Sequence, residues 1–359
     1  MFQSKMLEEI RQQPAVLQQT LAQELDAIPA LRKVFAKRKP RLIVLAARGT
    51  SDNAAQFGRY LLEITTGIPV SLAAPSIYTL YESTVNFDDV LVVAISQSGE
   101  STDTNVVLER ARKRGATTIG ITNERNSALA RLSEHVFLVR AGKERSVAAT
   151  KTYTGQLLIL YLLAYALGAR IRVDDLKRLP EWTNSALSLE PEIAERAACY
   201  RSMEHAVVVG RGLNYSNVFE FALKLMETCY VVAERFSSAD LLHGPIAMLE
   251  ASFPVFVFAA PGVTWPGLAK LLGRLAKMKA ETLLITDKSN HAACRSSGGK
   301  PNIVRVCIPT SLATKSCPSD LFTPIPYIIP AQIFAACLAE VKGLDPDNPR
   351  ALQKVTRTL

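Results

Sequence analysis

The sequence predicts an α/β protein with two similar domains, each built on a doubly wound parallel sheet. Short runs of consecutive apolar residues alternate with segments of helical length, which is typical of parallel strands buried on both faces. The same order of runs then returns once along the chain. The offset is 163 residues from Gly49 to Gly212 and 164 residues from Ile121 to Ile285. Matched strands at a nearly constant offset indicate a duplicated domain rather than a solenoid repeat.

The first half contains four expected strands and the helices that connect them. The strands lie at residues 42–45, 90–95, 117–121 and 136–139, and the clearest helical segments lie at 53–65 and 103–114. The longest strongly apolar stretch, at 157–169, is too short to cross a bilayer and is expected to form a buried helix. In such sheets ligands bind beyond the carboxyl ends of the strands, which directs attention to the loops there.

The second half repeats this organisation. Its expected strands lie at residues 206–209, 255–259, 282–285 and 303–307, with a helix over 217–230. We expect a helical segment over 1–30, a first α/β domain over 31–172, a second over 173–345 and a C-terminal tail over 346–359.

Composition and charge exclude several classes of protein. Of the 359 residues, 48% are hydrophobic and 21% are charged, which excludes a disordered chain and a fibrous protein. The net charge of +9 favours a small anionic ligand over nucleic acid, because no basic helix carries interleaved aromatic residues. The N-terminus shows no secretory signal, so a cytoplasmic protein without a membrane partner is expected.

The six cysteines all lie in the second half, and no two of them have CxxC spacing. A zinc ribbon and a thioredoxin-like site are therefore disfavoured. Most of the cysteines adjoin apolar residues, so we expect reduced thiols in the core.

Residues 95–104 form the most informative segment of the chain. This run of serines, threonines and glycine follows a strand and opens a helix. Hydroxyls and free backbone N–H groups at a helix N-terminus suit a phosphate. Simple capping of the helix by Ser101 or Asp103 explains the same residues equally well. The segment is not a Walker A loop, because the GK[ST] ending is missing.

The loop Ser96-Gln97-Ser98-Gly99-Glu100-Ser101 resembles the phosphate loop of the sugar isomerase (SIS) domain family. Similar motifs continue along nearly the whole chain, and those quoted for the resemblance are Glu9-Ile10 with Gln13-Pro14, Arg48-Gly49-Thr50-Ser51, Ser146-Val147-Ala148-Ala149-Thr150-Lys151, Ala222-Leu223-Lys224-Leu225-Met226-Glu227, Leu242-His243-Gly244-Pro245 and Asp345-Pro346-Asp347-Asn348-Pro349-Arg350. Within the family, the chain resembles the isomerase half of glucosamine-6-phosphate synthase and the type II glucosamine-6-phosphate deaminases.

The resemblance implies two tandem SIS domains, each a flavodoxin-like doubly wound sheet flanked by helices. It also implies one sugar-phosphate site, in the first domain. The residues expected to bind the sugar phosphate are Thr50, Ser51, Ser96, Gln97, Ser98 and Ser101. Glu144 and the backbone of Val147 are expected near the sugar.

The acid–base groups follow from the same resemblance. Aldose–ketose chemistry needs a group that opens the sugar ring and a base that moves a proton between C1 and C2. Glu227 lies on the predicted helix and matches the family's base, although most helical glutamates are simply solvated. Lys224, at i−3, either pairs with Glu227 as an ordinary ion pair or steadies the substrate oxygens.

His243 matches the ring-opening histidine that the family supplies from the partner subunit, which implies a homodimer with shared sites. Lys354 matches a lysine of the tail that assists ring opening, although a terminal lysine is normally solvated. Glu220 and Glu234 are further candidates for supporting carboxylates.

The expected reaction is the conversion of glucosamine 6-phosphate to fructose 6-phosphate and ammonia. The chain reaches the isomerase region almost at its start, so we expect no glutaminase and no glutamine-dependent synthesis by this chain alone. Met226 stands where the family often has a lysine, which leaves the exact substrate open. The alternatives are a fructosamine-6-phosphate deglycase and a synthase-type isomerase without its glutaminase.

Two readings from other classes are weaker. A non-catalytic sugar-phosphate regulator is disfavoured by the joint presence of the three acid–base candidates. A nucleotide-dependent oxidoreductase is disfavoured because Gly210-Arg211-Gly212 lacks the third glycine of that fingerprint. We expect no metal and no redox cofactor, because proton carriers suffice for the C1–C2 transfer.

Overall fold

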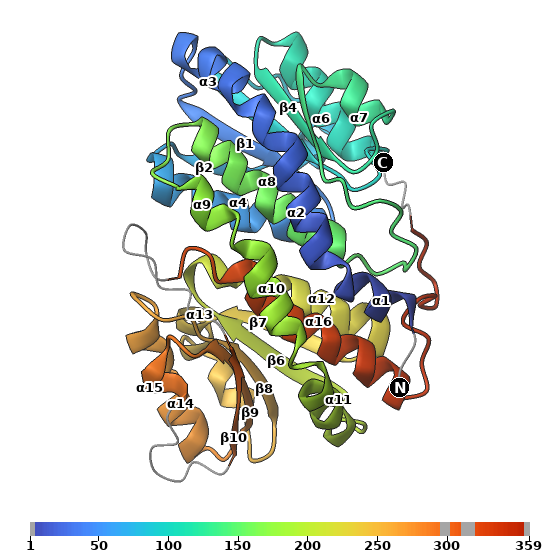
Figure 1. Cartoon of the computed structure of the whole chain (residues 1–359), viewed down its shortest axis with the longest axis vertical. Helices are drawn as coiled ribbons and strands as arrows, with labels where there is room; N and C mark the ends of the chain where they lie inside the picture. Colours follow the sequence, from blue (N-terminus) through green and yellow to red (C-terminus); the bar gives the residue numbers. More distant parts are fainter. Residues whose placement is uncertain (1–3, 295–301, 310–319, 355–359) are drawn as a thin grey trace. The chain divides into compact units, whose positions relative to one another are not determined.

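The structure is a computed structural model, and it describes residues 4–294, 302–309 and 320–354. It divides into two compact units (Figure 1). The first-sheet unit comprises residues 12–144, 149–178 and 351–359, and the second-sheet unit comprises 1–11, 145–148 and 179–350. The short segment 145–148 thus belongs to the second-sheet unit.

The first-sheet unit contains a five-stranded parallel sheet in the order β2-β1-β3-β4-β5. Its strands are β1 (Leu42–Ala46), β2 (Val70–Leu72), β3 (Val90–Ile95), β4 (Thr117–Thr122) and β5 (His135–Leu138). Its helices are α2 (Gln13–Glu24), η1 (Leu25–Ala27), α3 (Ile28–Lys37), α4 (Thr50–Thr66), α5 (Ser76–Thr79), α6 (Thr102–Lys113), α7 (Ala128–Leu132), α8 (Lys151–Ala166) and α9 (Val173–Leu176).

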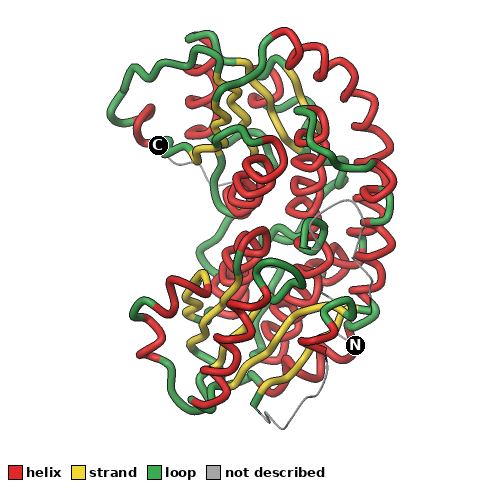
Figure 2. The backbone as a smooth tube through the Cα atoms, turned by 90° about the vertical axis from the view of Figure 1, so that its left-hand side faces the viewer, coloured by secondary structure: helices red, strands yellow, loops and turns green. Residues whose placement is uncertain are grey.

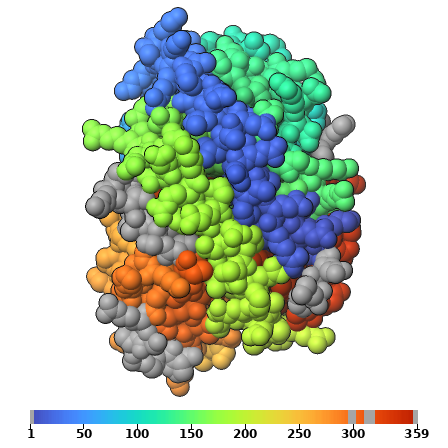
Figure 3. All heavy atoms as spheres, viewed as in Figure 1, coloured from blue at the N-terminus to red at the C-terminus, as the bar shows by residue number. Residues whose placement is uncertain are grey.

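Helices cover both faces of this sheet, because successive side chains of each strand point to opposite sides. On one face Val92 and Ala94 pack with Val107 and Leu108 of α6 and with Leu129 of α7. On the other face α4 packs against α8, which also contacts α2 and α3. Figure 2 shows the strands with helices to either side, and Figure 3 shows the N-terminal helices α2 and α3 at the surface of the unit. The strands are continuously apolar because helices bury both faces of the sheet.

The second-sheet unit repeats this topology, with the strand order β10-β9-β8-β6-β7. Its strands are β6 (His205–Gly210), β7 (Val232–Ser237), β8 (Pro254–Phe258), β9 (Glu281–Asp287) and β10 (Ile303–Ile308). Its helices are α1 (Lys5–Arg11), α10 (Leu179–Leu187), α11 (Glu190–Cys199), η2 (Gly212–Asn214), α12 (Tyr215–Cys229), α13 (Ser238–Leu242), η3 (Pro245–Met248), α14 (Trp265–Lys277), α15 (His291–Cys294) and α16 (Pro324–Val341).

The two faces of the second sheet have different cores. One face packs aliphatic residues of β6 and β8 against α14, for example Val207 and Val257 against Leu271. The other face carries aromatic edge-to-face pairs, in which Phe221 of α12 meets Phe256 of β8 at 5.1 Å between ring centroids. The prediction of two doubly wound parallel sheets is confirmed.

Helix α16 is the most apolar element of the second-sheet unit. By length and composition it could cross a membrane, with 18 residues and a mean hydropathy of 1.4, but 89% of it is buried in the structure. Burial on all sides explains why it lacks a polar face. It is longer than the apolar stretch at 157–169 that the sequence analysis singled out, most of which forms α8.

The expectation of reduced cysteines is wrong for one pair. Cys294 of α15 and Cys307 of β10 form a disulfide, because the turn between β9 and α15 brings two residues 13 apart in sequence to the same place. Cys199, Cys229 and Cys337 are free, and the latter two are buried as expected. Cys317 lies outside the described residues.

Candidate functional site

The predicted phosphate loop lies at the carboxyl edge of the first sheet, between β3 and α6. The strand order changes direction between β1 and β3, which is where doubly wound sheets open a crevice for ligands. Arg48, in the loop after β1, donates to the buried carboxylate of Asp103 in α6, with Nη2 and Nε at 2.8 and 3.1 Å from Oδ2. This ion pair joins the two loops that flank the crevice.

Gly99 sets the shape of the phosphate loop. Its φ is +67°, and a Cβ atom at this position would lie 2.2 Å from the hydroxyl oxygen of Ser127. The Gly99 N–H donates to Ser96 Oγ at 3.1 Å, and the Gly99 carbonyl accepts from Asn105 Nδ2 at 3.1 Å. Only glycine combines this conformation with so close an approach to the start of α7.

The hydroxyl groups of the loop do not cap α6. Ser101 is the N-cap residue, but its hydroxyl pairs with Thr104 Oγ1 at 3.1 Å and makes no bond to a helix N–H group. Among the described residues, none accepts from the backbone N–H groups of Thr102 and Thr104. The helix N-terminus thus keeps donors that can hold an anion, and Asp103 pairs with Arg48 instead of capping.

The other predicted phosphate ligands differ in burial and in their hydrogen-bond partners. The Gln97 carbonyl accepts from Asn123 N at 3.0 Å, whereas the Gln97 side chain is half-buried beside the loop. Ser98 Oγ accepts from Glu100 N at 3.3 Å. Thr50 begins α4 and is half-buried, whereas Ser51 is buried and its hydroxyl accepts from Gln156 Nε2 of α8 at 3.0 Å. The Ser51 hydroxyl is therefore hydrogen-bonded to α8.

Glu144 and Lys354 meet in the first-sheet unit. The fully buried Glu144 carboxylate accepts from the backbone N–H groups of Thr150 and Thr152, at 2.9 and 3.2 Å, at the start of α8. The same carboxylate accepts from Thr152 Oγ1 at 2.6 Å and from Lys354 Nζ at 3.3 Å. Val147 belongs to the second-sheet unit, where its N–H donates to Asp347 O at 3.2 Å.

The acid–base candidates of the second-sheet unit lie on α12. Lys224 Nζ is 2.5 Å from Glu227 Oε2 and 3.6 Å from Glu220 Oε1. The side chains of Lys224 and Glu220 are 1% and 0% exposed, whereas that of Glu227 is 24% exposed. A buried ammonium thus holds a carboxylate that still reaches the surface of the unit. This arrangement fixes the orientation of Glu227 while leaving it accessible to a ligand.

The loop after α13 carries His243. This histidine is exposed, it ends α13, and Gly244 follows with a φ of +143°. Met226, which precedes Glu227, is 37% exposed. Glu234 is exposed on the edge strand β7, and no described residue forms a side-chain hydrogen bond or ion pair with it.

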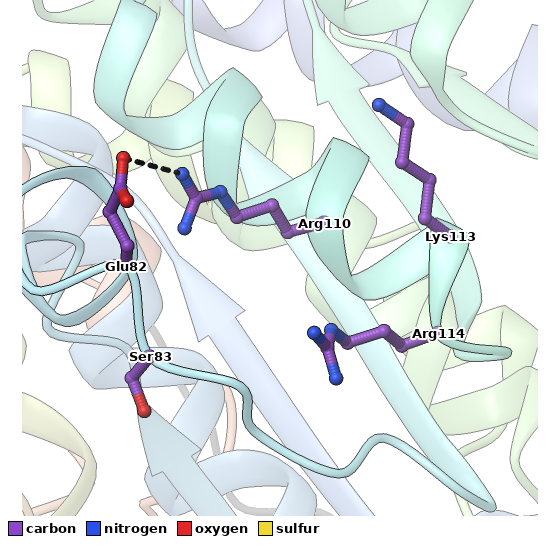
Figure 4. Close-up of a pocket in the computed structure, with 5 residues that line it drawn as sticks. All are labelled: Glu82, Ser83, Arg110, Lys113 and Arg114. Carbon is purple, nitrogen blue, oxygen red and sulfur yellow. Dashed lines mark ion pairs between the residues drawn. The ribbon is translucent and has the colours of Figure 1, made fainter.

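A separate hollow lies at the other end of α6 (Figure 4), with a volume of about 420 Å³. Its lining residues are Glu82, Ser83, Arg110, Lys113 and Arg114. Arg110 pairs with Glu82 at 3.9 Å and Lys113 with Glu109 at 2.6 Å, so most of its charge is already balanced. Cations at the end of a helix are expected from the helix dipole, and no predicted site residue lines this hollow.

Sequence reasoning missed the two contacts that organise these groups. The ion pair of Arg48 with Asp103 joins residues 55 apart, and Gln156 reaches Ser51 across 105 residues. Arg48 and Asp103 both lie within motifs that the sequence analysis singled out, but nothing in the chain indicates that they meet. The structure brings Lys224, Glu227 and Glu220 together in one unit, and Glu144 with Lys354 in the other.

Comparison with known proteins agrees with this architecture. The sequence pattern of the SIS domain matches residues 36–166 and 200–322. The chain therefore belongs to the SIS domain family.

Particular relatives resemble almost the whole chain. The chain is 35% identical to a glutamine–fructose-6-phosphate aminotransferase (isomerizing) of Xylella fastidiosa over 373 residues, which cover 98% of the chain and 59% of that protein. It thus spans about three fifths of the length of this curated relative. The structure matches the C-terminal domain of glucosamine-fructose-6-phosphate aminotransferase from Francisella tularensis with a TM-score of 0.85 and 28% identity, over 97% of the chain and 98% of that domain. A glucosamine-6-phosphate deaminase of Thermotoga maritima shares the fold with a TM-score of 0.77 at 22% identity, over 99% of this chain and 100% of that chain.

Proposed function

We propose that this chain is an amino-sugar phosphate isomerase and deaminase that converts glucosamine 6-phosphate and water to fructose 6-phosphate and ammonia. The observation that carries the proposal is the accessible Glu227 carboxylate, oriented by the buried Lys224 ammonium. Membership in the SIS family and the open phosphate loop support it. The same proton transfer serves amine release and amine addition, so the direction depends on the supply of ammonia.

Substrate binding rests on the phosphate loop in this proposal. The hydroxyls of Ser96, Ser98 and Ser101 and the free N–H groups at the start of α6 hold the phosphate, with Thr50 and the Gln97 side chain at the rim. Hydrogen bonds to a dianion are charge-assisted and therefore strong. No lysine is needed, because the phosphate is a handle and is not transferred.

Ring opening is assigned to His243 and Lys354. We propose a homodimer in which His243 comes from the partner subunit, because the exposed loop after α13 leaves its imidazole free to reach another molecule. Lys354 Nζ donates to the Glu144 carboxylate, so this lysine has a docking point in the first-sheet unit.

Glu227 performs the C1–C2 transfer. It removes the proton from C2 of the open-chain amino sugar and returns a proton to C1, through an enolamine. The product is the imine of fructose 6-phosphate, which water hydrolyses with loss of ammonia. Lys224 keeps the carboxylate in one orientation, and geometry of this kind decides the efficiency of a general base.

The test is a stoichiometric assay on the purified chain given glucosamine 6-phosphate. We expect equal amounts of ammonia and fructose 6-phosphate, and Glu227→Gln should lower turnover by about 10²–10⁴-fold, the usual contribution of a general base. Glu195→Gln, an exposed glutamate of α11, is the matched control and should keep normal turnover. Near-normal turnover by Glu227→Gln would show that the base is another group.

A second amino-sugar phosphate is a necessary comparison, because Met226 lies beside Glu227 at a position where the family resemblance implies a lysine. If glucosamine 6-phosphate releases no ammonia but still protects the protein against heat, the site is right and the substrate is wrong. Fructosamine 6-phosphate, the substrate of a deglycase, is then assayed with the same variants. If the protein binds every sugar phosphate offered and turns over none, the regulator interpretation replaces the enzyme.

A further inference from the structure

The second sheet has its own crevice, which the proposed function leaves unused. Its strand order changes direction between β6 and β8, as that of the first sheet does between β1 and β3. Arg211 follows β6 and is followed by η2, which begins at Gly212, and the loop after β8 ends at Thr264, which precedes α14. Asp320 lies in the turn before α16. Crevices of this type are the common ligand sites of doubly wound sheets.

Asp320 is a buried carboxyl group, and the described residues include no charged partner for it. It is 5% exposed, and in the described part of the chain no cation lies within ion-pair distance of it. Its own backbone N–H donates to the carboxyl, and burial raises the pKa of this carboxyl. An unpaired buried carboxylate is costly, so each such group in a folded protein calls for an explanation.

At the carboxyl edge of the first sheet, a buried carboxylate does have a cationic partner. There the buried Asp103 carboxylate is paired with Arg48, which follows β1. Arg211 holds the matching place after β6, but it is exposed and forms no ion pair with the described residues. The second sheet therefore keeps a buried acid for which the described residues provide no cation.

Thr264 adds an unsatisfied hydroxyl group at the same place. Its hydroxyl oxygen is buried, and no described residue forms a hydrogen bond with it. Thr264 is the N-cap residue of α14, yet its side chain makes no capping bond. The hydroxyl is thus available to a ligand as both donor and acceptor.

Gly212 shows that the two groups are neighbours. A Cβ atom on Gly212 would lie 3.0 Å from Thr264 Cγ2 and 4.0 Å from Asp320 Oδ2. Gly212 has a φ of +62°, which favours glycine, and a Cβ atom at this position would make an unusually close contact with the Thr264 methyl group.

We propose that Asp320 and Thr264 form a second binding site, at the carboxyl edge of the second sheet, for a small ligand with a primary ammonium group. An ammonium supplies three donors and the positive charge that Asp320 lacks, and the Thr264 hydroxyl accepts one of the donors. The carboxylate disfavours phosphate, so this site differs in charge preference from the phosphate loop. An amino sugar without phosphate is the simplest probe, because it carries the ammonium and brings hydroxyl donors beside it.

Calorimetric titration at pH 7 tests the proposal with three probes of similar shape. Glucosamine carries the charged amine, N-acetylglucosamine replaces it with a neutral amide, and glucose has a hydroxyl. We expect glucosamine to bind and the two neutral sugars to bind at least about tenfold more weakly, because only the first makes a charge-assisted contact. Equal binding of all three sugars would overturn the ammonium assignment.

Two variants locate the binding. Asp320→Asn keeps the shape and removes the charge, and it should weaken glucosamine binding about tenfold or more, whereas Thr264→Val should weaken it several-fold. Glu195→Gln is the control for an exposed charge in the same unit and should bind like the wild type. Removal of an unpaired buried charge should leave the melting temperature unchanged or higher, so loss of binding is not loss of folding.

The outcomes separate this site from the phosphate loop. Glucosamine bound in the phosphate-loop crevice would be unaffected by Asp320→Asn, and that result would overturn the proposal. Absence of glucosamine binding by the wild type would do the same and would leave bound water as the explanation of the two polar groups. Glucosamine 6-phosphate turnover is measured in parallel, so failure of the second site and failure of the proposed reaction are recorded independently.

Discussion

Gly99→Ala tests the geometry of the phosphate loop. The backbone at this position has a φ of +67°, and alanine pays about 1–2 kcal/mol for adopting it. The new Cβ would lie 2.2 Å from Ser127 Oγ and 2.4 Å from Ser127 Cβ, which requires movement of α7 or of the loop. Overpacking of this kind costs about 1–3 kcal/mol. Together we expect a loss of about 2–5 kcal/mol in the free energy of unfolding.

Gly115→Ala is the matched control, because Gly115 also has a positive φ, +84°, but its Cβ would meet nothing within 4 Å. It should lose only the conformational part, about 1–2 kcal/mol. Urea unfolding of the three proteins measures the difference, and the KM for the sugar phosphate should rise in Gly99→Ala alone, since only that loop changes shape. Equal losses in the two variants would refute the argument from the close approach to Ser127.

Two other predictions concern the shared site and the buried thiols. In a dimer with shared sites, Glu227→Gln and His243→Asn should each be inactive when expressed alone. When the two variant subunits are co-expressed, about a quarter of the wild-type activity should return, because half of the dimers are mixed and each mixed dimer has one intact site. If no activity returns, both groups act in the site of the same chain. Burial raises the pKa of Cys229 to about 12, so at pH 8 iodoacetamide should alkylate Cys199 but not Cys229, as peptide mass mapping can show. Between about pH 9 and about pH 12 the Cys229 thiol is neutral in the native protein but ionised in the unfolded chain, so the native state should lose stability as the pH rises through this range. Alkylation of native Cys229 at pH 8 would contradict its burial.

The central strands and the edge strands β5 and β10 were predictable from sequence, whereas the edge strands β2 and β7 were not. Strand β3 has the predicted bounds, 90–95, because six consecutive apolar residues are buried on both faces. Strand β2 has three residues, and β7 alternates exposed Val232 and Glu234 with buried Ala233, since an edge strand is covered less completely. Neither produces a continuous apolar run, so a rule based on such runs overlooks both.

The sequence by itself determined the duplicated architecture, the family and the segments from which a site could be built, because apolar periodicity and motif order are local properties of the chain. Tertiary structure alone decided which side chains meet. It placed the Lys224 ammonium between Glu220 and Glu227, put Lys354 on Glu144 across 210 residues, and joined Cys294 to Cys307. It also left Asp320 buried, with no cation beside it among the residues that the structure describes. Contacts of this kind depend on how helices and loops pack over a sheet, and that packing is set by the whole chain rather than by the residues near each group.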